Sequence, residues 1–171
     1  MRLLEELDLI CPKCGGRTSF HDSYDRHVHM GEKIEWITLH RVICGKCGKT
    51  HAIIPDFIRP YKHYSACDTE MALRDQEDGI HLEEIETSAS ISTLRRWVEE
   101  FKHRGLQAAG ALRSILYRHY NKFINELEAA STKVFRMIDR LLDLLPEVES
   151  SHLAIGEANM WLTNHMAGVF V

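Results

Sequence analysis

The stretches Cys11-Pro-Lys-Cys14-Gly and Cys44-Gly-Lys-Cys47-Gly decide how the N-terminal part of this chain folds. Each is a CxxCG loop, in which the final glycine lets the backbone turn with a positive φ and point its amides at the sulfurs. The two pairs are separated by 29 residues, a long spacing that predicts a zinc ribbon with an extended β-hairpin between its two cysteine knuckles. Four thiolates are the ligand set of a structural zinc ion. The predicted ligands of one structural Zn²⁺ are Cys11, Cys14, Cys44 and Cys47.

Two disulfide bonds are the alternative use of these four cysteines. They would leave the fifth cysteine, Cys67, without a partner, and the N-terminal sequence MRLLEELDLI is too charged for a secretion signal. We expect Cys67 to be a buried, inert thiol, because free cysteines are most often core residues. Reduced cysteines, together with the lack of an apolar run of about 18 residues, predict a cytoplasmic protein that does not enter a membrane.

Alternating β-branched and aromatic residues predict two strands between the knuckles, over 18–29 and 34–43, with a turn at 30–33. A short third strand over 50–54 follows the second knuckle, and two prolines then stop regular structure. A ribbon of this size is too small to bury a core and relies on its metal instead. The rest of the chain is therefore expected to fold separately.

From residue 66 onward the apolar period changes from two to about 3.6, which predicts helices to the end of the chain. A break is expected at Asp78-Gly79, and Ser90 or Ser92 can cap a later helix. The predicted helices cover residues 66–77, 81–87, 91–103, 108–128, 132–145 and 152–166. The predicted fold class is α+β, with a small β zinc ribbon in 1–60, an all-α helix-turn-helix in 61–104 and a C-terminal helical region in 105–171.

Charge is unevenly distributed, although the net charge is only −4. Residues 66–90 carry eight acidic residues against one arginine, whereas residues 91–122 carry seven basic residues against two glutamates. The second stretch offers a cationic surface, and the simpler interpretation is a solvated helix face. The helix predicted over 91–103 would be the last helix of a helix-turn-helix, which binds base edges in the major groove through arginines and phosphates through hydroxyls. The alternative for this region is an ordinary three-helix packing unit without DNA contacts. The predicted contacts to double-stranded DNA are Ser92, Thr93, Arg95, Arg96, Lys102 and Arg104.

The helices predicted over 108–128 and 132–145 each carry an apolar seam of residues spaced three and four apart. Such seams can pack on each other, on a protein partner or on a second copy of the chain. The apolar end at 167–171 also requires cover, which favours a homodimer.

The N-terminal half resembles short bacterial proteins that are similar to the front of insertion-sequence transposases. The shared motifs are CPKCGG (11–16), HDSYDR (21–26), RVICGKCGKTHAIIPDFIRPY (41–61) and STLRRW (92–97). This resemblance, over residues 11–104, implies cysteines on zinc and a helix-turn-helix on transposon-end DNA, with Thr93, Arg95, Arg96 and Trp97 as the matching helix residues. Such transposases continue into a nuclease domain with three carboxylates, for which the sequence after Gly105 is too short. A non-enzymatic DNA-binding regulator or mobile-element accessory factor is therefore expected.

Two other functions are weighed against this expectation. A protein-interaction adaptor would use the ribbon and the helices, with the acidic stretch at 75–86 as its contact. His27-Val28-His29 matches the His-hydrophobe-His pattern of single-strand endonucleases, which pair it with a tyrosine such as Tyr117 or Tyr120. The histidine-rich segment 21–29 is also a candidate second metal site. Strand alternation alone places His27 and His29 on one face, so exposed strand residues are the simpler interpretation.

Overall fold

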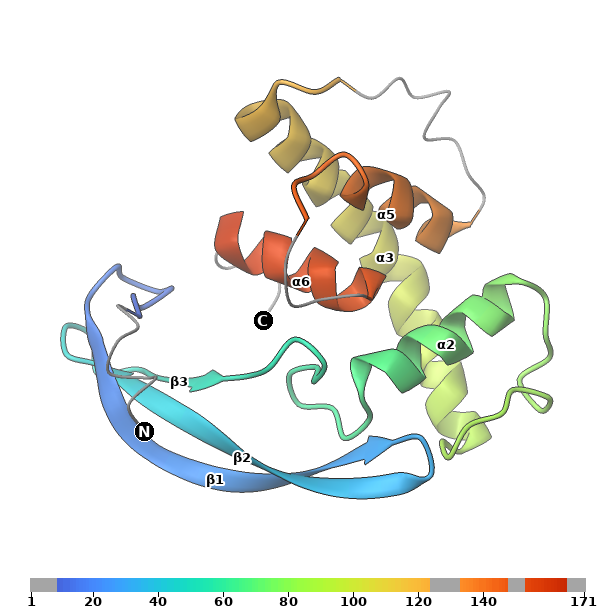
Figure 1. Cartoon of the computed structure of the whole chain (residues 1–171), viewed down its shortest axis with the longest axis horizontal. Coiled ribbons are helices and arrows are strands. Elements are labelled where there is room, and N and C mark those ends of the chain that lie inside the picture. Colours follow the sequence, from blue (N-terminus) through green and yellow to red (C-terminus); the bar gives the residue numbers. More distant parts are fainter. Residues whose placement is uncertain (1–8, 124–132, 148–152, 166–171) are drawn as a thin grey trace.

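The computed structural model describes residues 9–123, 133–147 and 153–165. Within them, a three-stranded antiparallel sheet is followed by four helices (Figure 1). The elements are β1 (Thr18–Met30), β2 (Lys33–Cys44), β3 (Thr50–Ile53), α2 (Ala66–Glu77), α3 (Ile91–Tyr120), α5 (Val134–Leu142) and α6 (Ala154–His165). The predicted α+β fold class is confirmed.

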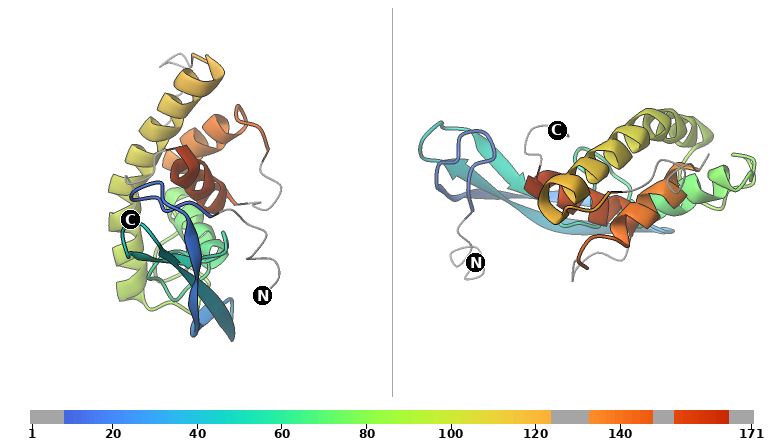
Figure 2. Two further views of the ribbon diagram at one scale, coloured as in Figure 1. Left: turned by 90° about the vertical axis from the view of Figure 1, so that its left-hand side faces the viewer. Right: turned by 90° about the horizontal axis from the view of Figure 1, so that it is seen from above.

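The long hairpin predicted between the knuckles is present. β1 and β2 pair from Thr18↔Cys44 to Met30↔Lys33, and β3 adds to the other edge of β2. Gly31 takes the positive φ of 62° that the tight turn requires. The hairpin is strongly curved, and its concave side faces the helices (Figures 1 and 2).

A small core joins the sheet to the segment that follows it. Val28 of β1 and Leu39 of β2 pack with Ile58 of this segment, and all three are buried. The same segment runs along the edge of β1, where the amide of His29 donates to the carbonyl of His63 at 2.6 Å. These contacts fix the connection between the sheet and α2 against the concave face.

α3 is one continuous helix of 30 residues, so the prediction of separate helices over 91–103 and 108–128 is wrong at this point. An isolated helical glycine costs only about 1 kcal/mol, and Gly105 does not break the helix. A Cβ on Gly105 would lie 2.7 Å from Cγ1 of Val134, so the missing side chain lets α5 approach closely. α3 ends at Tyr120, and the predicted remainder beyond residue 123 lies outside the described residues.

Both ends of α3 follow local signals. Ser90 is the N-cap, and its Oγ accepts a hydrogen bond from the amide of Thr93 at 3.3 Å, as predicted. Asn121 closes the other end with a left-handed φ of 51°. Because α3 runs across residue 104, the parts predicted as 61–104 and 105–171 share a helix, and the division of the chain into domains remains a prediction.

Residues 82–84 form a turn and the rest of 81–87 has no regular structure, so the short helix predicted there is wrong. Leu82 and Ile85 pack against the helical core and hold the segment in place. A helix this short gains too few hydrogen bonds to offset its nucleation, and its adjacent glutamates repel each other. Within the described residues of 61–104, α2 and α3 are therefore joined by an irregular connection, 78–90, and not by a third helix.

The helices share one core around the middle of α3. Leu112 and Leu116 are fully buried, in one cluster with Phe135 and Leu141 of α5 and Trp161 of α6. The apolar seams predicted for the C-terminal helices are thus used within the chain. The homodimer remains a prediction, and residues 167–171, which helped to suggest it, lie outside the described residues.

Three charged side chains along α2 hold the C-terminal helices in place. The carboxylate of Glu70 accepts hydrogen bonds from the first two amides of α6, at 3.3 and 2.9 Å. Glu77 accepts from the first two amides of α5, at 2.8 and 3.2 Å. Between them, Arg74 donates twice to Asp139 of α5, at 2.9 and 2.8 Å. Part of the acidic stretch in 66–90 therefore caps helices, which otherwise end in unsatisfied amides.

Candidate metal centre and surrounding surfaces

The four predicted cysteine ligands converge at the open end of the hairpin. Their sulfur atoms all lie within 4.8 Å of one another. The Cys11–Cys47 sulfurs are 3.7 Å apart and the Cys14–Cys44 sulfurs 3.5 Å apart, far longer than the 2.0 Å of a disulfide bond. All four are free thiols, so the arrangement can hold a metal ion and does not form the alternative disulfides.

The two knuckles have the same backbone geometry. Gly15 and Gly48 take φ values of 66° and 67°, and each donates its amide, at 2.9 Å, to the carbonyl of the cysteine four positions earlier. The positive φ predicted for these glycines is confirmed, while their own amides bind carbonyl oxygens and not the sulfurs. Gly16 has a different role, because a Cβ there would lie 2.7 Å from Cβ of Lys46 and 3.0 Å from the sulfur of Cys44. The knuckles can pack this closely only if residue 16 has no side chain.

Pairing within the sheet brings the knuckles together. Cys44 ends β2 directly opposite Thr18, the first residue of β1, and the amide of Gly45 donates to the carbonyl of Arg17 at 3.2 Å. The 29 residues between the pairs therefore fold back as a hairpin and return the second pair to the first. Cys11 and Cys44 are buried, whereas Cys14 and Cys47 are half-buried at the outer side.

The thiols of Cys14 and Cys44 differ in their pKa values. Hydrogen bonds from the backbone amides of Cys47 and Lys46 lower the pKa of Cys44 to about 6. The amide of Gly16 acts in the same direction on Cys14, but burial and the neighbouring thiols outweigh it and raise the pKa of Cys14 to about 12. Because its pKa is raised, Cys14 ionises at neutral pH only where a bound cation displaces its proton.

His51 lies beside the cluster but is not part of the four-sulfur set. Its Nε2 is 3.2 Å from the sulfur of Cys11, and β3 holds it there. The cysteine motifs alone do not indicate this contact. The available signal was its position, because β3 begins directly after the second knuckle and pairs back onto β2. Outer hydrogen-bond partners of this kind orient metal ligands and tune their charge.

The histidine-rich segment 21–29 does not form a second metal site. Over the described parts of the chain, the four cysteines are the only group of three or more potential ligands close enough to share an ion. His27 stacks on His63 with ring centroids 4.3 Å apart, and His29 stacks on Tyr64 at 4.6 Å. These histidines pack with aromatic rings at the edge of the sheet.

The prediction that Cys67 is buried is wrong. It is exposed on α2, where its sulfur lies 3.7 Å from that of Met71. The buried face of α2 is formed by other positions, among them Ala66, Leu73 and Glu70. Cys67 falls on the opposite face because of the helical period.

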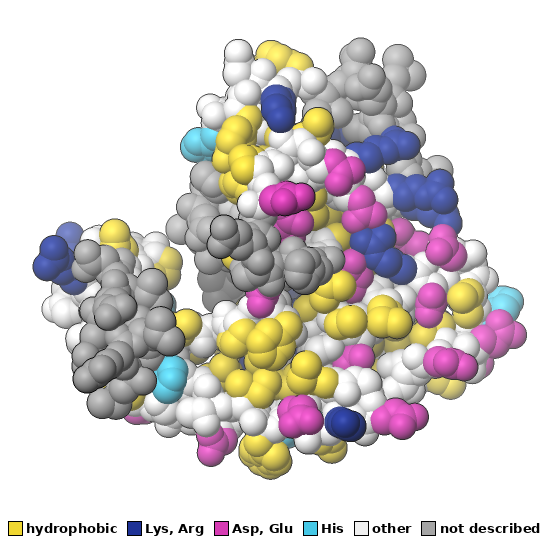
Figure 3. Space-filling model, viewed as in Figure 1, with side chains coloured by type: hydrophobic (Ala, Val, Ile, Leu, Met, Phe, Trp, Pro, Cys, Tyr) yellow, Lys and Arg dark blue, Asp and Glu magenta, His cyan; other side chains and the backbone are white. Residues whose placement is uncertain are grey.

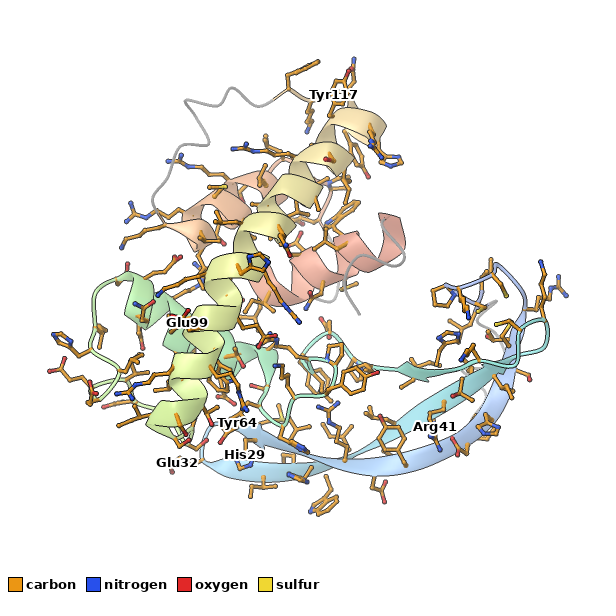
Figure 4. The ribbon with its side chains drawn as sticks, turned by 180° about the vertical axis from the view of Figure 1, so that it is seen from behind. His29, Glu32, Arg41, Tyr64, Glu99 and Tyr117 are labelled. Atoms are coloured by element: carbon orange, nitrogen blue, oxygen red, sulfur yellow. The ribbon has the colours of Figure 1, made fainter. Side chains whose placement is uncertain are left out.

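The structure does not assemble the endonuclease site. His29 stacks on Tyr64, whose ring meets Trp97 near the start of α3 at 5.0 Å. Tyr117 lies 20 positions further along the same helix, which corresponds to about 30 Å. Figure 4 shows His29 and Tyr117 at opposite ends of the molecule. Tyr120 packs edge-on against Trp161 in the helical core.

The predicted DNA contacts lie on the first half of α3, all exposed except the half-buried Thr93. They do not form one row. Thr93 and Arg104 fall on one flank of the helix and Arg95 and Lys102 on the other, because successive positions are rotated by about 100°. Three of the bases already face acids. The nitrogen–oxygen distances are 4.0 Å for Arg95–Glu83, 3.1 Å for Lys102–Glu99 and 3.0 Å for Arg104–Glu100.

Comparison with known proteins identifies the family and no function. A family model described as a domain of unknown function, DUF6431, matches residues 11–97, from the first knuckle to the second turn of α3. The chain therefore belongs to the DUF6431 family. No curated protein and no solved structure matches it. Among the helices of the described residues, none combines the length and the apolar composition needed to cross a bilayer.

Proposed function

We propose that this protein is a zinc-stabilised DNA-binding protein without an enzymatic activity of its own. It would act in the cytoplasm as a regulator or mobile-element accessory factor. The resemblance of its motifs to the front of insertion-sequence transposases supports the proposal, and both knuckles and the STLRRW motif carry this resemblance.

The separations of the sulfurs support zinc as the metal. Zinc–sulfur bonds of about 2.3 Å place tetrahedrally arranged sulfurs about 3.8 Å apart. Two of the sulfur pairs are separated by 3.7 and 3.5 Å and all four sulfurs lie within 4.8 Å of one another, so one ion fits with little movement. Four thiolates in a closed shell suit a structural ion, and the soft sulfur ligands favour zinc over magnesium or calcium.

The observation that carries the DNA-binding proposal is the exposed start of α3. Arg95 and Arg96 project from its second turn, and its first turn, which is described in full, holds no acidic side chain. The amides of a helix N-terminus attract phosphates, and arginine side chains can bind guanine edges in the major groove. α3 therefore offers both kinds of contact within two turns.

A titration against duplex DNA at two salt concentrations tests this function. Arg95→Ala and Arg96→Ala should each weaken specific binding by about 1–3 kcal/mol, because each removes a base-reading side chain. Arg118→Ala is the matched control, since it removes an exposed arginine from the last turn of the same helix. Equal affinity of all three variants and the parent protein would reject α3 as the reading helix. Binding that is absent or insensitive to salt would reject the function.

One observation favours a second function, a protein-interaction adaptor. Glu83, Glu84 and Glu86 are exposed on the connection that precedes α3, close enough for Glu83 to meet Arg95. These charges would repel a phosphate backbone and would suit a basic partner protein. Capture of a partner that persists after nuclease treatment, and that is lost when the three glutamates are changed to glutamine, would support the adaptor.

A further inference from the structure

Three cations converge on a single carboxylate between the sheet and α3. Glu100 has a side chain that is only 14% exposed, and its oxygens lie 2.7 Å from Nζ of Lys62 and 3.0 Å from Nη1 of Arg104. Nη2 of Arg59 is 3.6 Å away, and this side chain is 15% exposed. Arg59 and Lys62 belong to the segment after β3, so residues about 40 positions apart in sequence form this cluster.

The cluster of Arg59, Lys62 and Arg104 has more positive charge and more hydrogen-bond donors than the carboxylate of Glu100 can neutralise or accept from. Three positive charges face one negative charge. Lys62 donates a hydrogen bond to Glu100, but among the described residues no acceptor takes one from the guanidinium of Arg59 or of Arg104. Each guanidinium carries five N–H groups. Burial lowers the pKa of Arg59, and the neighbouring Arg104 acts in the same direction. The unused N–H groups of Arg59 are not fully enclosed, so water can reach them and an anion can take its place.

The cluster lines an open groove of about 1530 Å³ between the concave sheet and helices α3 and α6. Figure 3 shows the surface hollowed between the knuckle end of the sheet and the helical body. Tyr61 lies at this groove beside Lys62, with its side chain 85% exposed and its backbone at φ 58°. That conformation is uncommon for a tyrosine and costs about 1–3 kcal/mol. An exposed tyrosine therefore lines the same groove as the cations.

We infer that Arg59, Lys62 and Arg104 bind the phosphate group of a nucleotide in this groove, with the ring of Tyr61 available to stack on the base. Arginine forks and lysine ammonium groups are the usual ligands of phosphate, and aromatic rings stack on every base. The nucleotide could be free or part of a single strand, because both present the same phosphate chemistry. The site is distinct from the outer face of α3 proposed to bind duplex DNA, with only Arg104 common to both.

Isothermal titration of the full, metal-loaded chain with inorganic phosphate, ATP and a 5′-phosphorylated oligothymidine tests the inference. Lys62→Gln and Arg59→Gln should each weaken binding by about tenfold or more, the usual effect of a lost charge-assisted hydrogen bond. Glu100→Gln should strengthen binding, because it removes the carboxylate that competes for the cations. Arg118→Gln is the matched control, since Arg118 is exposed on the last turn of the same helix and belongs to neither proposed site.

If Arg59→Gln fails to fold, the double variant Lys62→Gln/Arg104→Gln takes its place, with circular dichroism and metal content as the criteria for folding. Binding of ATP but not of the oligonucleotide would identify a free nucleotide, and the reverse a strand; both outcomes support the site. Heat signals that are absent at millimolar ligand, or equally weakened by Arg118→Gln, would overturn it. Arg95→Ala and Arg96→Ala should lose duplex binding but still bind ATP. That result would show that the duplex-binding face of α3 and the groove are separate sites.

Discussion

Gly105→Ala tests the continuous helix α3 and its contact with α5. The new methyl group would lie 2.7 Å from Cγ1 of Val134 and 3.2 Å from the ring of Phe101, where unstrained contacts need at least 3.4 Å. Overpacking of this kind costs about 1–3 kcal/mol. Alanine in a helix interior recovers about 1 kcal/mol relative to glycine. The expected net effect is therefore a loss of about 0–2 kcal/mol in the free energy of unfolding.

Gly110 provides the matched control in the same helix. It is exposed, and a Cβ there would meet no atom of the described residues within 4 Å. Gly110→Ala should therefore stabilise the protein by about 1 kcal/mol, since only the helix propensity changes. The double variant Gly105→Ala/Val134→Ala removes the methyl groups that clash and should recover part of the stability lost in Gly105→Ala, up to the cost of truncating Val134.

Urea denaturation of the metal-loaded proteins, followed by far-ultraviolet circular dichroism, measures these differences. The free energies of Gly105→Ala and Gly110→Ala should differ by about 1–3 kcal/mol, in favour of Gly110→Ala. Equal stabilisation by both substitutions would refute the close approach of α5 to α3. Destabilisation by both would refute a continuous helix through residues 105–110.

Three further predictions follow from individual contacts. His51→Ala should lower metal affinity by about 10- to 100-fold at unchanged stoichiometry in a chelator competition, because it removes the partner of the Cys11 sulfur; equal affinity would refute this role. Glu77→Gln should cost about 1 kcal/mol in urea denaturation, because it removes the charge that caps α5, and Asp75→Asn is the control on the same helix. The pKa of Glu100 is lowered because hydrogen bonding by Lys62 and the nearby arginines outweigh burial. The ionised carboxylate therefore stabilises the fold fully above its unfolded pKa of about 4, and this contribution is lost as the pH falls through the lower folded pKa. Glu100→Gln should therefore reduce the pH dependence of unfolding below about pH 4, and an unchanged profile would contradict the assignment.

Local signals explain which elements the sequence predicts. The strands around the knuckles and the helix over 66–77 depend on residues close together in the chain, and the observed bounds agree within one residue. Ser90 caps α3 through its own neighbours. The cysteine cluster is also predictable, because only the spacing within each pair and the chemistry of thiolates are required.

The features that the sequence does not predict depend on contacts between distant segments. Gly105 looks like a helix break until α5 is seen to pack on it. Glu70 and Glu77 look like surface acids, but they cap helices that begin 57 or more positions later. The cations around Glu100 are dispersed over two segments, so no local pattern marks them.

Thiol counting combined with metal analysis tests the four-cysteine centre most directly. Native mass spectrometry of the purified chain should show one zinc ion per chain. Alkylation under native conditions should modify one cysteine, the exposed Cys67, because the other four are metal ligands. Denaturation with a chelator should then expose all five thiols. A metal-free native chain with five reactive thiols, or one that contains two disulfide bonds, would contradict the account.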